Sequence, residues 1–285
     1  MRVPLREPVG RMAAVAATLV QGPSGWGERT TAPPGYPVDP AAAGRAAEEA
    51  AFGSWPPAVR DRVPVNDLVP AVAPDWAAAL AAAAVAAGSR CLKVKVGPGV
   101  DDDRVAAVRD AVGPHVRLRV DANGSWDLDR AAVAIRRLAR YGLELVEQPV
   151  ATLDDLARLR RRVDVAVAAD ESVRSVDDAR VLARLDAADA VVVKVQPLGG
   201  VGPALAVAEA AGVPAVVSSL YETSVGVAAG LALAGALPEL PYACGLSTAA
   251  LLAGDVVADP LVPVGGELVV RRPEPDPDLL DLYGD

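Results

Sequence analysis

The chain has 285 residues, 52% of them hydrophobic, and a formal net charge of −9, which allows one large α/β domain with a small extra lobe. The negative charge disfavours nucleic acid and acidic membrane surfaces as partners, so we expect a small-molecule ligand. The two cysteines, Cys91 and Cys244, form no CxxC motif, so no disulfide framework or thiolate zinc site is expected and a reducing, cytoplasmic location is the natural default.

Residues 1–62 are predicted to form a small α+β capping lobe. The apolar run at 11–20, RMAAVAATLV, resembles the core of a signal peptide, but no convincing cleavage site follows it, and we interpret it as a strand. A turn-rich stretch then precedes an Ala-rich helix near residues 40–51. The longest apolar stretches, 76–87 and 225–237, fall short of the length that crosses a bilayer and are interpreted as barrel helices.

Residues 63–258 are predicted to form a barrel of alternating strands and helices. It begins with a strand at 63–70, which is followed by a helix from about 74 to 87. A weaker eighth strand is expected near PYACGLS, at 241–247. The tail, residues 259–285, carries a short apolar segment that we expect to return to the capping lobe.

A ladder of polar side chains runs through the barrel segment. Its members are separated by 26, 26, 23, 24 and 24 residues, and each closes a short apolar run: Lys95, Asp121, Glu147, Asp170, Lys194 and Ser218. This interval is the length of one strand and helix unit, so the side chains should meet at the same end of parallel strands, where barrels build active sites. Packing alone explains such a ladder poorly, because buried charges are costly unless they are paired or metal-bound.

Three lysines, Lys93, Lys95 and Lys194, are the only ones in the chain, and the other basic residues are arginine. Arginine stays protonated in proteins, whereas a partly buried lysine can lose its proton and act as a base. Lys93 and Lys95 lie two residues apart on one strand, so they share a face, and each makes the charge of the other more costly. Lys194 should face this pair across the barrel mouth. The alternative interpretation is that the three lysines have no chemical role and that a GC-rich genome left them by chance.

Three carboxylates, Asp121, Glu147 and Asp170, end consecutive strands. Oxygen ligands from separate strand ends suit a hard divalent cation, Mg²⁺ or Mn²⁺. Alternatively, each acid caps a helix or pairs with an arginine, which explains one of them easily and three in register poorly. A lysine base on one side, a cationic lysine on the other and a metal between them predict proton removal next to a carboxylate, with stabilisation of the enediolate.

Five motifs together resemble the enolase superfamily in its muconate-lactonizing-enzyme subgroup: KVK at 93–95, DANGSW at 121–126, VEQP at 146–149, ADES at 169–172 and KVQPLGG at 194–200. The resemblance covers about residues 63–250. The runs at 218–226, SSLYETSVG, and 241–248, PYACGLST, are most similar to the o-succinylbenzoate synthase family of the actinobacterial type. That family has a (β/α)₇β TIM-like barrel with an N-terminal capping domain closed by the C-terminal tail.

The resemblance implies a Mg²⁺-dependent lyase of menaquinone biosynthesis. Its substrate is 2-succinyl-6-hydroxy-2,4-cyclohexadiene-1-carboxylate, and syn elimination of water gives 2-succinylbenzoate. Asp121, Glu147 and Asp170 match the metal ligands of the family. Lys95 matches the base that takes the α-proton and then protonates the departing hydroxyl; enolase-superfamily sites with a lysine or histidine base and Mg²⁺ are a general pattern.

The resemblance also assigns roles around Lys95. Lys194 stabilises the anionic intermediate from the opposite face, and Lys93 tunes Lys95. The remaining implied residues are two serines that bind the succinyl carboxylate and two supporting residues beside the site: Ser218, Ser219, Asn123 and Glu171.

Alternatives remain at this point. The loop after Glu28, TTAPPGYPVD, has few apolar side chains to close over a ring, which leaves the substrate less certain than the metal and lysines. An N-succinylamino acid racemase or a related epimerase would use Lys95 and Lys194 as two bases, although CGLST lacks the DxD signature of dipeptide epimerases. A non-catalytic metal-binding barrel is the third hypothesis. The single histidine, His115, is expected at the face away from the site, and the sequence gives no oligomeric state.

Overall fold

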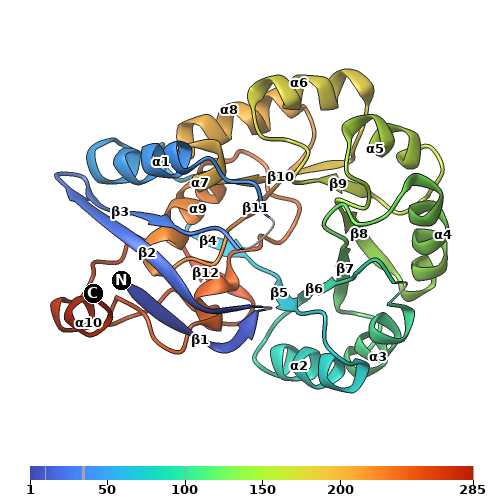
Figure 1. The fold of residues 1–285 in the computed structure, drawn as a ribbon, viewed down its shortest axis with the longest axis horizontal. Helices are drawn as coiled ribbons and strands as arrows, with labels where there is room; N and C mark the ends of the chain where they lie inside the picture. Colours follow the sequence, from blue (N-terminus) through green and yellow to red (C-terminus); the bar gives the residue numbers. More distant parts are fainter. Residues whose placement is uncertain (10, 34–35, 100, 285) are drawn as a thin grey trace.

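The computed structural model describes residues 1–9, 11–33, 36–99 and 101–284. A barrel of strands with helices on its outside occupies one side of the molecule, and a smaller antiparallel sheet with one helix lies against it (Figure 1). In these described ranges, no helix is both long enough and apolar enough to span a membrane.

The barrel strands are parallel and follow chain order, as the sequence predicts. Within the described residues, seven of them form one sheet: β5 (Asp67–Val69), β6 (Cys91–Lys95), β7 (Arg117–Asp121), β8 (Leu143–Glu147), β9 (Val167–Ala169), β10 (Ala190–Lys194) and β11 (Ala215–Ser218). The eighth position is filled by single bridges of the segment 242–245, where Cys244 pairs with Val65 and Gly245 with Ser218. The predicted eighth strand is therefore present as a short closing segment, and the (β/α)₇β fold class is confirmed.

Helices follow the strands and cover the outside of the sheet (Figure 1). They are α2 (Pro74–Ala86), α3 (Asp102–Val112), α4 (Leu128–Leu138), α5 (Leu153–Arg160), α6 (Val176–Leu185), α7 (Val195–Leu198), α8 (Val201–Ala211) and α9 (Ser224–Ala236), with short 3₁₀ helices at Ala139–Tyr141 and Ser247–Leu251. Several begin at a polar cap whose side chain accepts a backbone N–H bond, such as Asp127, Thr152, Ser175 and Thr223.

The main core lies between the sheet and these helices. Outward side chains of the strands, such as Leu118, Val120 and Val193, are fully buried there. Each such side chain contributes about 1.5–3 kcal/mol on burial. A much smaller apolar cluster fills the barrel interior, including Leu145 and Val216. The core therefore leaves the carboxyl ends of the strands free to carry polar groups.

The capping lobe is an antiparallel sheet with one helix. It consists of β1 (Arg2–Val9), β2 (Met12–Gly22), β3 (Gly25–Thr30) and α1 (Pro40–Phe52). The signal-peptide-like run lies within β2 and α1 matches the predicted Ala-rich helix, so both interpretations are confirmed. Gly27 permits the close packing of α1, because a Cβ there would lie 2.0 Å from the carbonyl oxygen of Ala47.

The start of the barrel and the tail differ from expectation. Residues 63–70 do not form one strand, because β4 (Arg62–Pro64) pairs antiparallel with β12 (Glu267–Val269) and only β5 joins the barrel sheet. The tail also contacts the cap, since Arg272 donates to the carbonyl oxygens of Trp26 and Ala50. It ends in α10 (Pro277–Tyr283). The domain boundaries at 62 and 259 stay a prediction.

A second core joins the two ends of the described chain. Val3 and Val15 of the capping sheet are buried against Leu252, Val256 and Val257. Leu280 and Tyr283 of α10 pack on the same cluster. The capping lobe is thus built from segments about 250 positions apart in the sequence.

Candidate active site

The ladder side chains collect at the carboxyl end of the barrel strands, as predicted. All but one are the last residues of their strands and Asp170 directly follows β9: Lys95, Asp121, Glu147, Asp170, Lys194 and Ser218. The register places Asp121 beside Lys95 on one side and beside Glu147 on the other. A pocket at this end is lined by Lys93, Lys95 and Lys194 together with Asp121 and Asp170.

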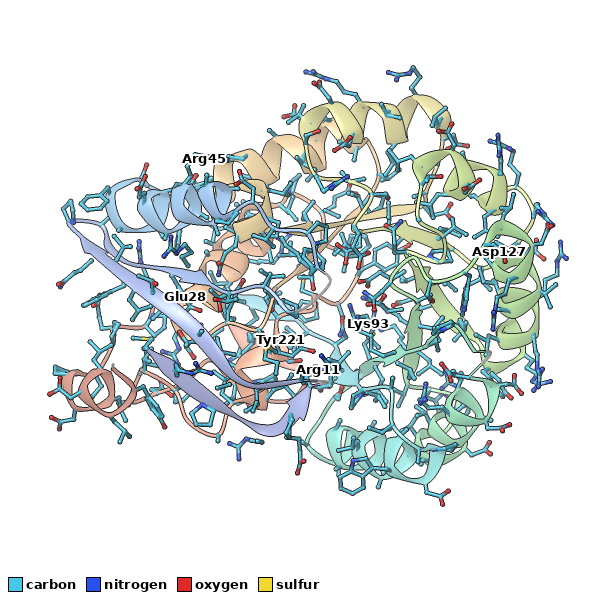
Figure 2. All side chains as sticks on the ribbon, viewed as in Figure 1. Arg11, Glu28, Arg45, Lys93, Asp127 and Tyr221 are labelled. Carbon is cyan, nitrogen blue, oxygen red and sulfur yellow. The ribbon has the colours of Figure 1, made fainter. Side chains whose placement is uncertain are left out.

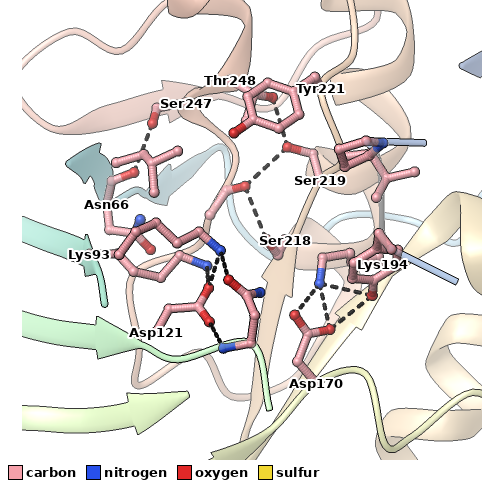
Figure 3. Close-up of a pocket in the computed structure, with 17 residues that line it drawn as sticks. Asn66, Lys93, Asp121, Asp170, Lys194, Ser218, Ser219, Tyr221, Ser247 and Thr248 are labelled. Atoms are coloured by element: carbon pink, nitrogen blue, oxygen red, sulfur yellow. Dashed lines mark hydrogen bonds and ion pairs between the residues drawn. The ribbon is translucent and has the colours of Figure 1, made fainter. Parts of the chain in front are cut away.

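On one side of the pocket, Lys93 and Asp121 lie close together (Figure 3), and Lys95 and Glu147 complete a compact group of two ammoniums and two carboxylates. Lys95 Nζ lies 2.6 Å from Asp121 Oδ2 and 2.8 Å from Asn123 Oδ1. Lys93 Nζ lies 2.9 Å from Glu147 Oε1 and 3.2 Å from Asp121 Oδ2. The predicted shared face of the two lysines is confirmed, because both reach the same oxygen of Asp121.

The third lysine lies on the other side of the pocket (Figure 3). Lys194 is buried and forms an ion pair with Asp170, and it donates to Tyr36 Oη at 3.0 Å. Gln148 holds the backbone of Asp170 in place, since its Oε1 accepts from the Asp170 N–H at 2.6 Å. Lys194 therefore faces Lys93 and Lys95 across the barrel mouth, as expected.

Burial and neighbouring charges shift the titration of these groups. Although burial disfavours the charge of Lys93, the carboxylates of Glu147 and Asp121 raise the pKa of its ammonium well above the ordinary range. Burial also opposes the charge of Lys194, yet Asp170 holds the pKa of Lys194 far above its usual value. Lys93 and Lys194 are therefore stable cations in this arrangement.

The carboxylates respond in opposite directions. Burial disfavours the ionised form of Asp121, but Lys95 and Lys93 together hold its pKa well below the usual range. Burial, joined by the charges of Asp121 and Asp170, raises the pKa of Glu147 to about 7 despite the opposing effect of Lys93. At Glu147, burial and the neighbouring acids thus outweigh the effect of Lys93, whereas at Asp121 the two lysines outweigh burial.

These acids fit a hard cation in their chemistry. In the part of the chain that the structure describes, no three His, Cys, Asp or Glu side chains form a ready ligand group, and each of the three acids instead contacts a lysine ammonium. Their donors are carboxylate oxygens from adjacent strand ends, and a divalent cation held there would favour the ionised form of Glu147, which burial and the neighbouring acids disfavour. Asp121, Glu147 and Asp170 are the residues that would hold such an ion.

Hydroxyl groups form another wall of the pocket. Ser219 Oγ lies 3.1 Å from the carbonyl oxygen of Gly245 and 2.8 Å from Thr248 Oγ1, and Ser218 Oγ lies 3.4 Å from the same carbonyl. The Ser219 N–H donates to the same carbonyl oxygen at 3.0 Å, so both the amide and the hydroxyl of Ser219 already have partners within the protein. Both serines line the pocket, and their role in substrate binding stays a prediction.

Asn123 and Glu171 are the two proposed supporting residues, and Asn123 connects Glu171 to Lys95. Its Oδ1 accepts from Lys95 and its Nδ2 donates to Glu171 Oε1 at 2.8 Å. Burial, reinforced by the charge of Asp170, raises the pKa of Glu171 above its usual value. The structure therefore brings Asn123 and Glu171 together beside Lys95, and their supporting role remains a prediction.

Several pocket residues escaped the sequence reasoning. Tyr36 comes from the capping loop that was described as poor in apolar side chains, and Asn66, Tyr221 and Thr248 also line the pocket. Asn66 had a usable signal, because it is a polar residue between apolar neighbours in VPVNDLVP. Tyr36 had only the weak signal of being the one aromatic residue in its loop.

Comparisons with known proteins agree with this geometry. Residues 76–275 match the family model of the enolase C-terminal domain-like proteins. The muconate lactonizing enzyme of Pseudomonas fluorescens, solved with muconolactone, superposes with a TM-score of 0.89 at 24% identity, covering 99% of this chain and 96% of that one. This similarity supports the TIM-like barrel with a cap.

Curated relatives are closer in sequence. The o-succinylbenzoate synthase of Thermobifida fusca is 53% identical over 275 residues, which are 95% of this chain and 86% of the relative. That of Mycobacterium ulcerans is 45% identical over 288 aligned positions, covering 99% and 86% of the two chains. The chain therefore belongs to the o-succinylbenzoate synthase family within the enolase superfamily.

Proposed function

We propose that this protein is a lyase that eliminates water from 2-succinyl-6-hydroxy-2,4-cyclohexadiene-1-carboxylate and releases 2-succinylbenzoate, a step of menaquinone biosynthesis. The observation that carries the proposal is that one pocket is lined by Lys95, which is paired with Asp121, and by Lys194, which is paired with Asp170. The identity of 45–53% to o-succinylbenzoate synthases over nearly the whole chain supports the choice of substrate.

Membership of the enolase superfamily implies a divalent metal, and we propose Mg²⁺, with Mn²⁺ as a substitute. Asp121, Glu147 and Asp170 would hold it. When bound, the ion supplies positive charge that stabilises the enediolate formed from the substrate carboxylate. Its charge would also disfavour protonation of nearby Lys95.

Proton transfer is assigned to Lys95. As a neutral amine, it removes the proton α to the substrate carboxylate, and the electron pair moves into the enediolate. The ammonium of Lys95 then returns this proton to the hydroxyl on the same face, the C–O bond breaks, and water leaves as the ring becomes aromatic. One base thus serves both half-reactions, and no net proton is consumed.

The other lysines supply fixed charge. Lys194, which is held as a cation by Asp170, stabilises the negative charge of the intermediate from the opposite face. Lys93, also a stable cation, contacts the same Asp121 oxygen as Lys95, and its proposed role is to tune Lys95. The hydroxyls of Ser218 and Ser219 are proposed to bind the succinyl carboxylate.

The test follows the loss of the cyclohexadiene absorbance after addition of protein, with Mg²⁺ or with a chelator. We expect rapid loss with Mg²⁺ and none with chelator. Lys95→Ala and Lys95→Arg should both lower kcat by about 10²- to 10⁴-fold, because arginine keeps the charge but cannot act as a base at neutral pH. An active Lys95→Arg variant would contradict the assignment of proton transfer to Lys95.

The opposed lysines also fit a second candidate, a racemase of N-succinylamino acids that uses Lys95 and Lys194 as its two bases. This candidate predicts exchange of the substrate α-proton for deuterium in heavy water, with racemisation. If the cyclohexadiene is not consumed by folded, metal-loaded protein but this exchange occurs, the racemase replaces the lyase. Metal binding without either reaction would point to a non-catalytic barrel.

The composition supports the proposed cellular location and the proposed class of ligand. Cys91 and Cys244 are both buried free thiols, which suits a reducing cytoplasm. The net charge of −9 disfavours nucleic acid as a partner. A small carboxylate is therefore the proposed ligand.

A further inference from the structure

Tyr36 connects the capping loop to the catalytic side of the barrel. Its hydroxyl donates to Asp170 Oδ1 at 2.9 Å and accepts from Lys194 Nζ at 3.0 Å. These partners lie 134 and 158 positions away in the sequence. In addition, Lys194 Nζ lies over the Tyr36 ring, 4.5 Å from its centroid. One side chain of the cap therefore contacts both members of the ion pair opposite Lys95.

Tyr36 also separates the pocket from the outside of the molecule. It lines the pocket that contains the three lysines, and it lines two further hollows, one beside Arg29 and Ala43 and one beside Gly124 and Arg174. Pro33 lines all three as well, so Tyr36 and Pro33 together form the boundary between them. Removing the phenol ring should therefore open the catalytic pocket toward solvent.

The contacts of Tyr36 address a specific weakness of Lys194. A lysine has a flexible four-carbon stem and three donors that rotate freely, so an ion pair with one carboxylate does not fix its direction. Tyr36 adds two contacts to the Lys194 ammonium, one from its ring face and one from its hydroxyl, and both come from the capping loop rather than from the barrel strand that carries Asp170. Together with Asp170, they leave the ammonium one orientation.

We infer that Tyr36 is a positioning residue, which fixes the Lys194 ammonium against Asp170 and closes the pocket on the side opposite Lys95. This inference rests on the proposed function for its effect on turnover, but the contact itself does not. The hydroxyl and the ring have separable effects, since Tyr36→Phe removes only the hydrogen bonds and Tyr36→Leu removes the ring as well.

The contact can be tested without any substrate, because the chain has three lysines. Protein labelled with ¹³C and ¹⁵N at lysine should give three sets of side-chain NMR signals, and Lys194→Arg identifies the set that belongs to Lys194. The aromatic ring should shift the ε-proton signal of Lys194 upfield. We expect this shift to persist in Tyr36→Phe and to disappear in Tyr36→Leu. Identical Lys194 signals in the wild type and Tyr36→Leu would overturn the inference.

Kinetics then separates positioning from simple anchoring of the loop. Loss of the hydrogen bond to a charged group in Tyr36→Phe should lower kcat by about 10- to 100-fold with little change in KM. Tyr36→Leu should lower kcat further and raise KM, because the pocket is open. The matched control is Pro37→Ala, an exposed neighbour in the same loop, which should keep wild-type kcat. An unchanged kcat in Tyr36→Phe, or equal losses in the control, would contradict a positioning role.

The two proposals fail in different ways. If the wild type does not consume the cyclohexadiene although the upfield Lys194 signal depends on Tyr36, the proposed function fails and the positioning contact stands. If the wild type is active and the Lys194 signal is insensitive to Tyr36→Leu, the positioning role fails and the proposed function stands.

Discussion

Buried carboxylates at the barrel mouth have different partners from those at the interface between cap and barrel. At the barrel mouth, Asp121, Glu147 and Asp170 each contact a lysine ammonium. At the interface between cap and barrel, Glu28 of β3 instead accepts from the backbone N–H groups of Thr223 and Gly226 and from the Thr223 hydroxyl. Figure 2 labels Glu28 in the interface and Lys93 at the mouth.

The acids at the interface have raised pKa values. Burial and the nearby charge of Glu222 raise the pKa of Glu28 to about 8, and burial raises the pKa of Glu222 to about 7. Dipoles at the start of α9 thus satisfy the hydrogen bonds of Glu28 without neutralising its charge. The two regions therefore differ in the partners of their acids rather than in titration range. The three acids at the mouth contact ammoniums, whereas Glu28 is held by backbone and hydroxyl donors, and the pKa values of Glu147, Glu28 and Glu222 are all raised to about 7 or 8.

The largest expected effect comes from unpairing a charge at the mouth. Asp170→Asn leaves the buried Lys194 ammonium without its carboxylate, so we expect a loss of about 3–5 kcal/mol in the free energy of unfolding. Urea denaturation in the presence of chelator measures it. Adding Lys194→Met to this variant should recover part of the loss. The exposed pair Asp177 and Arg180 is the control, and Asp177→Asn should cost at most about 1 kcal/mol; equal costs at both positions would refute the contrast.

A smaller effect is expected from pH at the interface. The unfolded chain releases the Glu28 proton near its ordinary pKa of 4.5, whereas the folded protein keeps it up to about pH 8. This contribution to stability is therefore complete below pH 4.5 and is lost progressively as the pH rises to about 8. Urea denaturation at several pH values measures the slope.

Glu222→Gln sharpens that measurement. It removes a charge that repels Glu28 and keeps an oxygen to accept from the Leu220 N–H. We expect stability to fall less steeply with pH in this variant than in the wild type. Glu239→Gln, at an exposed position, should leave the slope unchanged. A Glu222→Gln slope equal to that of the wild type would remove the distinction between the regions.

The smallest effect is expected at Thr223, the N-cap residue of α9. Thr223 caps α9, since its Oγ1 accepts from the Val225 N–H and donates to Glu28. Thr223→Ala should lower the free energy of unfolding by about 1 kcal/mol, which thermal or urea denaturation detects. The matched control is Thr152→Ala, which removes the N-cap side chain of α5, a barrel helix away from the capping lobe. If both variants lost the same stability, the bond to Glu28 would contribute nothing beyond ordinary capping.

The ladder was predictable because it depends on one local rule. A strand ends, a polar residue follows the apolar run, and the interval repeats, so the positions of Asp121, Glu147 and Lys194 follow from chain order alone. The fold class follows from the same repeat. The chemical roles of these residues were assigned from residue type and resemblance, and they stay proposals.

The other features could not be predicted because they depend on how distant segments dock. Tyr36 reaches Lys194 only once the cap has settled on the barrel, and no pattern within TTAPPGYPVD records that distance. The same holds for β4 and β12, each three residues long, which pair across about 200 positions. Glu28 accepts hydrogen bonds from Thr223 and Gly226, which are about 200 positions away in the sequence, so its partners are set by the docking of cap and barrel.

The small core shared by β1, the 252–257 segment and α10 constrains how the chain folds during synthesis. Val3 and Val15 emerge from the ribosome first, yet Leu252 and Val256, which bury them, emerge near the end. The capping sheet must wait with an exposed apolar face while the barrel is made. Contacts of such long separation form slowly, so we expect the cap to refold after the barrel.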